Sequence, residues 1–115
     1  MANSLEITML LDLYGEALTN KQRDYLNFYY NDDLSLSEIA EGLGISRQGV
    51  RHVIKKGEEH LSFLEDRLGL AEHYEQLERA AKLIDGIKDA LKNGNLDTVA
   101  GTATLSEVQD IIISR

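Results

Sequence analysis

The residues of this chain best suited to bind another molecule through charge lie between positions 46 and 57. This stretch holds Arg47, Arg51, Lys55 and Lys56 and no acidic residue, which gives a local charge of +4. Guanidinium and ammonium groups pair with phosphate oxygens, and arginine also forms two parallel hydrogen bonds to guanine. Gln48 adds an amide group, which can pair with adenine in the same way. This combination of side chains is suited to nucleic-acid binding.

The spacing of these residues predicts that they share one face of a helix, opposite an apolar face. In helices that enter the major groove, the N-terminal residues meet base edges, whereas other basic residues contact phosphates. We therefore interpret Arg47 and Gln48 as base-reading residues and Arg51, Lys55 and Lys56 as phosphate contacts. The candidate DNA-binding residues are Ser46, Arg47, Gln48, Arg51, His52, Lys55 and Lys56.

The surrounding residues fit a helix-turn-helix motif, in which two short helices cross at a steep angle. Such a motif needs a small residue at the crossing, a turn residue that tolerates positive φ, and a cap for the second helix. Ala40, Gly44 and Ser46 occupy these three places. The remaining apolar positions of the pattern are expected to face a shared core, and they are Leu36, Ile39, Leu43, Ile45, Val50 and Val53.

Two other interpretations of the same residues stay open. Many helices carry a solvated basic face that binds nothing, and helix-turn-helix motifs also serve as contact modules for proteins or RNA. Gly42 and Gly49 lie within the two proposed helices, and each costs about 1 kcal/mol of helix stability relative to alanine. The motif therefore predicts the fold more strongly than it predicts DNA binding.

The sequence holds no pattern typical of an enzyme active site. His52, His60 and His73 do not stand in H-E-x-x-H or E-x-x-H arrangements, and the chain has no cysteine. No phosphate-binding G-x-x-x-x-G-K loop is found either. We therefore predict a protein without a catalytic residue, a metal or a cofactor.

The elements that position the basic residues are all predicted to be helices, because apolar residues never alternate over a sustained stretch. Capping boxes, in which Ser or Thr precedes Glu or Gln by three residues, predict helix starts after Thr19, Ser35 and Thr104. A fourth match, Ser62 with Glu65, lies within a longer apolar periodicity and is interpreted as accidental. We expect an all-α fold with helices over about 4–14, 20–31, 36–43, 47–57 with a continuation to 68, 70–92, and a short last helix after Thr104.

The long helix expected over residues 70–92 carries an apolar stripe with the 4-3 spacing of helix–helix seams, interrupted by Lys88. This stripe either packs on the first two helices as core or forms the seam of a homodimer. A small core can hardly cover so long a helix, which favours the dimer, and a two-fold dimer would set two basic helices apart. The candidate interface residues are Leu70, Tyr74, Leu77, Ala81, Ile84 and Leu91.

The formal charge of −8 does not exclude a nucleic-acid partner. Residues 1–57 hold 8 acidic and 6 basic residues, net −2, whereas residues 58–115 hold 12 and 6, net −6. The expected helix over 70–92 is about 35 Å long, and electrostatic influence in physiological salt decays over about 8 Å. Nearer acids matter more, and these are Glu38, Glu41, Glu58 and Glu59. We expect weak binding by one copy and moderate affinity from two.

The segment from Leu18 to Val53 resembles region 4 of bacterial σ70-type factors and, more closely, the small YlxM family of Gram-positive bacteria. The matching residues are Thr19, Gln22, Arg23, Tyr29 and Tyr30 in the first helix and Glu38, Ile39, Ala40, Ser46, Arg47, Gln48, Val50 and Arg51 in the motif. Gly49 departs from the alanine common at that point. The resemblance implies a helix-turn-helix protein that binds DNA and regulates transcription. Because such genes lie beside the gene for the signal recognition particle GTPase, it also implies a link with that pathway.

Length and composition fit a globular protein, with 115 residues of which 43% are hydrophobic and 28% charged. We divide the chain into a helix-turn-helix DNA-binding-like domain over 1–68 and a helical dimerisation or packing extension over 69–115. No apolar run approaches the roughly 18 residues of a membrane span, so we expect no membrane insertion. The absence of cysteine fits a reducing compartment and predicts a cytoplasmic protein.

Overall fold

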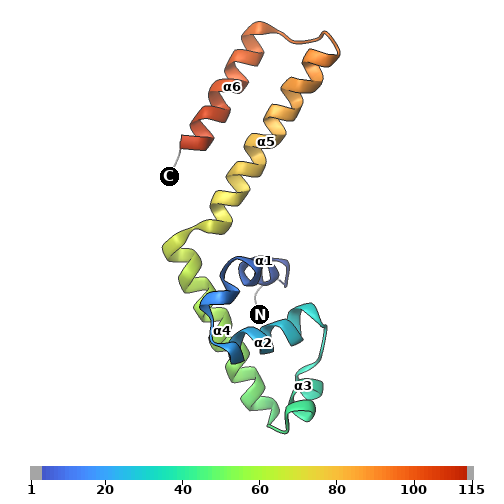
Figure 1. Ribbon diagram of the computed structural model, residues 1–115, viewed down its shortest axis with the longest axis vertical. Helices are drawn as coiled ribbons and strands as arrows, with labels where there is room; N and C mark the ends of the chain where they lie inside the picture. The colour runs from blue at the N-terminus through green and yellow to red at the C-terminus, as the bar shows by residue number, and fades with distance from the viewer. Residues whose placement is uncertain (1–3, 114–115) are drawn as a thin grey trace. The chain divides into compact units, whose positions relative to one another are not determined.

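The chain is helical in the computed structural model, which describes residues 4–113 (Figure 1). Six α-helices and no strand are found in this range, so the predicted all-α fold is confirmed. The elements are α1 (Ser4–Tyr14), a 3₁₀ turn (Gly15–Ala17), α2 (Asn20–Leu26), a π-helical turn (Asn27–Asn31), α3 (Leu36–Leu43), α4 (Arg47–Leu68), α5 (Leu70–Lys92) and α6 (Thr98–Ile113).

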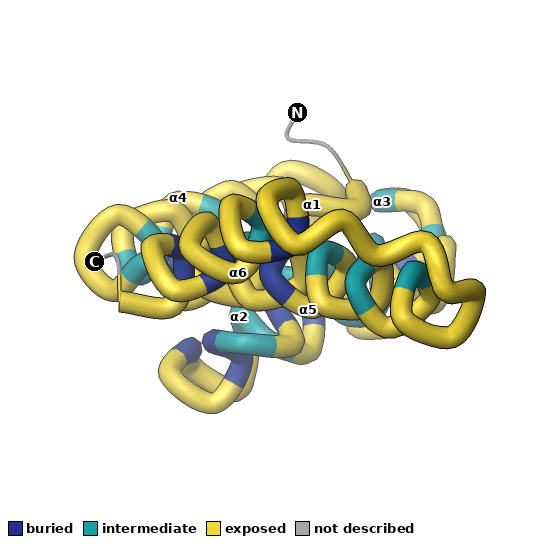
Figure 2. The backbone as a smooth tube through the Cα atoms, turned by 90° about the horizontal axis from the view of Figure 1, so that it is seen from above, coloured by how far each residue is buried: buried dark blue, intermediate teal, exposed yellow. Residues whose placement is uncertain are grey.

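Contacts within the chain divide it into two units, Met1–Ala71 and Glu72–Arg115. In the N-terminal unit, α4 is the central helix and packs against α1, α2 and α3. The largest fully buried side chains come from α1, α2 and α4. These side chains are Ile7, Leu26, Val50 and Leu61. Figure 2 colours the backbone by burial, with buried residues in dark blue.

Two of the three predicted capping boxes are confirmed. The hydroxyl of Thr19 accepts from the N–H of Gln22, whose side chain accepts from the N–H of Thr19. Ser35 and Glu38 form the same reciprocal pair at the start of α3, with both distances at 3.0 Å. Each box satisfies two backbone donors that lack partners within the helix, and therefore fixes where the helix begins.

Replacing Ser35 by alanine is expected to destabilise the N-terminal unit by about 1 kcal/mol, because α3 loses its side-chain cap. Urea unfolding followed by circular dichroism measures the difference. Ser37→Ala is the matched control, since Ser37 is exposed inside the same helix and alanine favours the helix there. Equal losses in the two variants would contradict a role for the cap.

The helix expected over residues 20–31 changes its winding after Leu26. Residues 27–31 form a π-helical turn, in which the N–H of Asp32 donates to the carbonyl of Asn27 at 3.0 Å. The hydroxyl of Tyr30 in this turn donates to Glu58 of α4 at 2.5 Å. The turn thus ties α2 to the helix that carries the basic face.

A hydrogen-bonded cluster holds the start of α5 within the N-terminal unit. The hydroxyl of Tyr14 donates to Glu65 at 2.6 Å and accepts from the N–H of Leu70 at 3.0 Å. The same oxygen of Glu65 accepts from the N–H of Ala71 at 3.0 Å. Burial, reinforced by Glu65, raises the pKa of the Tyr14 phenol. Tyr14 and Glu65 therefore take the place of a capping residue for α5.

The C-terminal unit is a hairpin of α5 and α6, joined by a turn that begins at Asn93 as predicted. The prediction of a short last helix after Thr104 is wrong, because α6 begins at Thr98 and runs for 16 residues. Asp97 caps it by accepting from the N–H of Val99 at 3.1 Å. Thr104 lies inside α6, and its hydroxyl donates to the carbonyl of Ala100 at 3.0 Å. A Thr followed three residues later by Glu also occurs within helices, and the Asp ahead of α6 is the stronger signal.

Candidate nucleic-acid interface

The basic residues are carried by α4, whose start is fixed by the turn that precedes it. Gly44 adopts φ = 70°, a left-handed conformation that other residues rarely take, and its N–H donates to the carbonyl of Glu41. The hydroxyl of Ser46 then accepts from the N–H of Gly49 at 3.0 Å. Ser46 is thus the N-cap of α4, and Arg47 is the first helical residue.

The two faces of α4 separate as the sequence predicts. Val50, Ile54, Gly57 and Leu61 are buried and Val53 is half-buried. All seven candidate DNA-binding residues are exposed, and they fill the cap and the first three turns of the helix. We call this surface the basic face of α4, and its members are Ser46, Arg47, Gln48, Arg51, His52, Lys55 and Lys56.

Two apolar residues beside the basic face differ from the prediction that they face the core. Leu43 is 42% exposed and Ile45 is 41% exposed. Both flank the turn between α3 and α4, where no further element covers them within the N-terminal unit. Ile39 and Ala40 are buried as expected, so these two residues supply the buried side chains of α3 where it packs against α4.

The charges along α4 run against the helix dipole. No acidic residue stands in the first turn, whereas Arg47 and Arg51 do stand near the N-terminus, which already carries partial positive charge. A cation in the first turn, such as Arg47, costs roughly 0.3–1 kcal/mol of helix stability, and Arg51, one turn further along, costs less. A helix N-terminus with added arginines attracts phosphate, so the arrangement favours an anionic ligand over the stability of the helix.

Carboxylates border the basic face at its C-terminal end. Lys56 forms an exposed ion pair with Glu59 at 3.5 Å. Glu58 lies with Arg51 and Lys55 around a hollow of about 260 Å³. The Tyr30 phenol donates to Glu58, and burial together with the Glu58 carboxylate raises the pKa of this phenol above its ordinary value. Phosphate contacts are thus favoured most near Arg47, and they are opposed near Lys56 and on the side of Arg51 and Lys55 where Glu58 lies.

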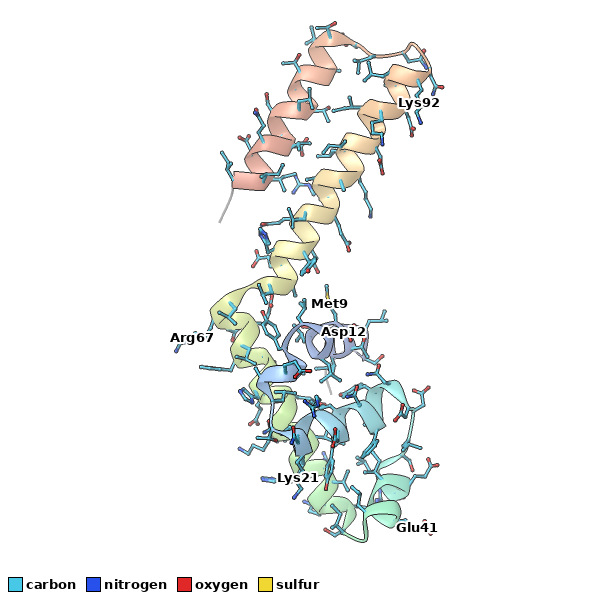
Figure 3. All side chains as sticks on the ribbon, in the orientation of Figure 1. Met9, Asp12, Lys21, Glu41, Arg67 and Lys92 are labelled. Carbon is cyan, nitrogen blue, oxygen red and sulfur yellow. The ribbon has the colours of Figure 1, made fainter. Side chains whose placement is uncertain are left out.

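The two acidic residues of α3 are placed differently. Glu38 is held in the capping box, where the hydrogen bond from the backbone N–H of Ser35 lowers the pKa of its carboxyl. Glu41 is exposed on α3 and labelled in Figure 3. Both carry negative charge in the same motif as the basic face, so they lower its affinity for any anion within about a screening length of 8 Å.

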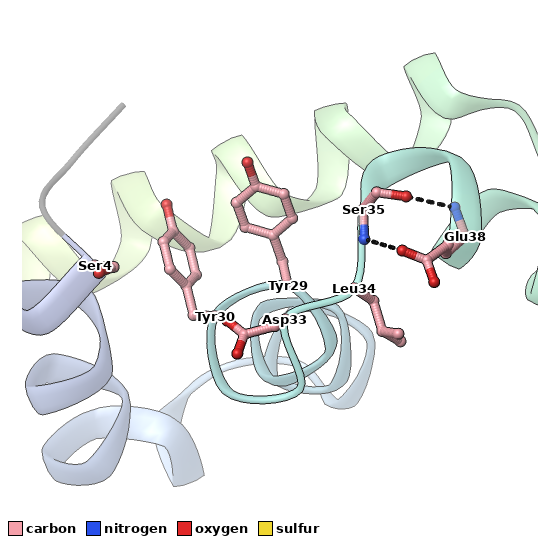
Figure 4. Close-up of a pocket in the computed structure, with 7 residues that line it drawn as sticks. All are labelled: Ser4, Tyr29, Tyr30, Asp33, Leu34, Ser35 and Glu38. Carbon is pink, nitrogen blue, oxygen red and sulfur yellow. Dashed lines mark hydrogen bonds between the residues drawn. The ribbon is translucent and has the colours of Figure 1, made fainter.

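A second hollow, of about 500 Å³, lies beside the π-helical turn (Figure 4). Its lining includes the phenols of Tyr29 and Tyr30 and the carboxyl groups of Asp33 and Glu38. Because these carboxylates repel phosphate, the hollow does not extend the nucleic-acid interface. Among residues 4–113, no group of three or more His, Cys, Asp or Glu side chains is placed to hold a metal.

Comparison with known proteins identifies the family of the chain. The family model described as "Putative helix-turn-helix protein, YlxM / p13 like" matches residues 1–99. The chain belongs to this family, UPF0122. The match includes the whole helix-turn-helix and α5 and ends at the second residue of α6. The predicted resemblance to the YlxM family is confirmed.

Relatives in the UPF0122 family match most of the chain. A UPF0122 protein of Clostridium kluyveri is 42% identical over 100 residues, which cover 86% of this chain and 90% of the relative. One of Listeria innocua is 40% identical over 105 residues, covering 91% and 93%. One of Thermoanaerobacter is 46% identical over 85 residues, covering 73% of each chain. None of the helices within residues 4–113 is long and apolar enough to cross a membrane.

Proposed function

We propose that this chain binds DNA through the basic face of α4 and acts as a regulator without catalysing a reaction. The observation that carries the proposal is the run of exposed polar and basic side chains over the cap and first three turns of the second motif helix. In helix-turn-helix proteins this part of the helix enters the major groove. The charges oppose the helix dipole, so stability does not explain them. A DNA partner places the protein in the cytoplasm.

In this proposal the residues of the basic face have different tasks. Arg47 and Gln48 lie in the first turn of α4 and read base edges, guanine and adenine being their best partners. Arg51 and Lys55 contact phosphates, with Lys56 weakened by its ion pair with Glu59. Ser46 and His52 lie beside these residues and donate hydrogen bonds to the sugar–phosphate backbone of the DNA. Two copies acting together raise the affinity.

The salt dependence of binding tests the proposal. With about three phosphate contacts per protomer, the logarithm of the association constant is expected to fall against the logarithm of salt concentration with a slope of about −3. Fluorescence anisotropy on labelled duplexes of random sequence measures this slope, and selection from a duplex pool then measures sequence preference. No binding at low salt would contradict the proposal.

A second candidate function is a contact module for protein or RNA, and the exposed Leu43 and Ile45 favour it. These two apolar side chains flank the turn of the motif and could pack on a partner protein. The link with the signal recognition particle pathway, which the family resemblance implies through gene neighbourhood, belongs to this candidate. A pull-down that retains its partner after DNase and RNase treatment supports protein contact, and loss of the partner after DNase alone supports DNA binding.

A further inference from the structure

The hairpin of α5 and α6 has very little core of its own. Between residues 72 and 113 only Ala80, Gly101, Val108 and Ile111 are buried, with Leu83 packed against them. Two helices in one layer bury one stripe of each helix and leave the other apolar residues in solvent. Any apolar surface that the two helices do not bury against each other therefore needs a second layer of protein to cover it.

One such surface lies on α5. The predicted seam residues of this helix are all exposed, with Tyr74 52%, Leu77 39%, Ile84 39% and Leu91 60% accessible. Leu70, at the first position of α5, is 38% exposed, and Ala81 is exposed as well. The stripe is therefore not used in packing α5 against α6.

The second helix of the hairpin extends the same surface. At 100° per residue, the α5 stripe lies about 100° around the helix from Ala80 and Leu83, which face α6. On α6, Leu105 and Ile112 lie about 70° from the side that faces α5, and they are 50% and 52% exposed. Because the two helices run antiparallel (Figure 1), both rotations lead to the same side of the hairpin.

Charged residues occupy the opposite side of the hairpin. Arg79 of α5 pairs there with Glu107 of α6 at 2.8 Å, which confirms the rotational assignment of both helices. By the same helical periodicity, other charged residues of that side are Glu75, Lys82, Asp89 and Asp110. The hairpin is thus amphipathic as a unit. We call the side that carries the stripe the apolar face, and its members are Tyr74, Leu77, Ala81, Ile84, Leu91, Leu105 and Ile112. By the same periodicity one charged residue, Lys88, lies on this side between Ile84 and Leu91.

We propose that the apolar face packs against the same face of a second copy of this chain, so that two hairpins form a four-helix bundle. At 1.5 Å per residue, α5 is about 35 Å long and α6 about 24 Å long, and with about 10 Å of width for each helix the face offers roughly 600 Å². Stable interfaces bury about 800 Å² per partner and extend down to about 600 Å², so the area is at the lower end of what a dimer needs. The proposal goes beyond DNA binding and does not depend on it.

A second copy is favoured over other occupants because it is matched in length, width and chemistry. Its apolar face supplies a layer of equal size, and 4-3 spacing on α5 suits the interdigitated packing of helical bundles. The net charge of residues 72–115 is −3, from 8 acidic and 5 basic residues. Since Glu75, Asp89 and Asp110 lie on the opposite side, these like charges stay in solvent when two faces meet. Two-fold symmetry is also the commonest arrangement of homo-oligomers.

The mass of the full chain in solution tests the proposal. Light scattering at tens of micromolar protein is expected to give twice the chain mass. The double variant Leu77→Gln with Ile84→Gln is expected to weaken the dimer at least a hundredfold while helix content by circular dichroism stays unchanged. Ala103→Gln is the control, because Ala103 is exposed on the charged side and its variant should remain a dimer.

Thiol accessibility gives a second measurement that does not require disrupting the face. The chain has no cysteine, so Ala81→Cys and Ala103→Cys each introduce one thiol at an exposed alanine. Alkylation by a maleimide is expected to be at least tenfold slower for Ala81→Cys at high protein concentration and equal for both variants after dilution. A monomeric mass at every concentration would overturn the proposal. Protection that persists on dilution would show that the same chain covers the face, and a dimer that survives both glutamines would place the interface elsewhere.

Discussion

Replacing Arg47 and Arg51 together by alanine is expected to weaken DNA binding about a hundredfold at physiological salt. Each arginine contributes through charge and hydrogen bonds to the same short segment of duplex, and removing one such arginine costs roughly 1–3 kcal/mol. The salt slope should also become shallower by about 1, because Arg51 is assigned to a phosphate whereas Arg47 is assigned to base edges. Fluorescence anisotropy titrations over a range of salt concentrations measure both quantities.

The same double variant is expected to be as stable as the original chain, or slightly more stable. Both side chains are exposed, and both add positive charge near the positive end of the dipole of α4. Their removal should therefore raise the free energy of unfolding by a few tenths of a kcal/mol while binding falls. Opposite changes in stability and in binding are the signature of residues kept for a ligand.

A charge-matched control separates local contacts from the overall field. Lys82→Ala with Lys92→Ala removes the same two positive charges from exposed positions on α5, where Lys92 lies in the last turn (Figure 3). Its DNA affinity should stay within about twofold of the original, since these two lysines belong to the C-terminal unit and take no part in the basic face. Equal weakening in both double variants would show that only net charge matters, and the basic face would lose its assigned role.

The single variants distinguish the two tasks proposed for the arginines. Arg47→Ala should relax the base preference at one position of a selected site, because Arg47 is assigned to base edges. Arg51→Ala should weaken all sequences nearly equally, because phosphates carry no sequence information.

The helix-turn-helix could be predicted from sequence because each of its requirements is local. Ser35 and Glu38 cap α3, Gly44 takes the left-handed conformation of the turn, and Ser46 caps α4. The periodicity of Val50 and Ile54 then fixes which residues remain outside. These are one-helix or two-helix relations, so a single sequence contains them.

Features that depend on contacts between distant segments could not be read in the same way. Tyr14 and Glu65, which together cap α5, are 51 positions apart. Neither residue stands at the N-cap position directly before the helix. The exposure of Leu43 and Ile45 reflects the lack of a neighbouring element at the turn. The start of α6 differs for another reason, because two local signals compete there, and the cap is Asp97, which accepts from the N–H of Val99.

Gly57 also depends on a contact between segments that are distant in the sequence. Its replacement by alanine is expected to destabilise the N-terminal unit by about 1–3 kcal/mol. A Cβ atom at Gly57 would lie 2.8 Å from Cδ1 and 3.3 Å from Cγ of Leu26, and 3.4 Å from Cβ of Gln22. Leu26 is fully buried, so its side chain has no free space into which to move. The overpacking cost of such a contact exceeds the roughly 1 kcal/mol that alanine adds to helix propensity.

The control for this prediction is the same substitution at a glycine that no other segment approaches. Gly86 lies inside α5, and a Cβ atom there meets nothing within 4 Å. Gly86→Ala should therefore stabilise its helix by up to about 1 kcal/mol, the reverse of the effect at Gly57. Urea unfolding followed by circular dichroism measures both changes. If both substitutions stabilise, α2 and α4 do not pack at the distance that places Leu26 over Gly57, and the orientation of the basic face relative to the core would have to be reconsidered.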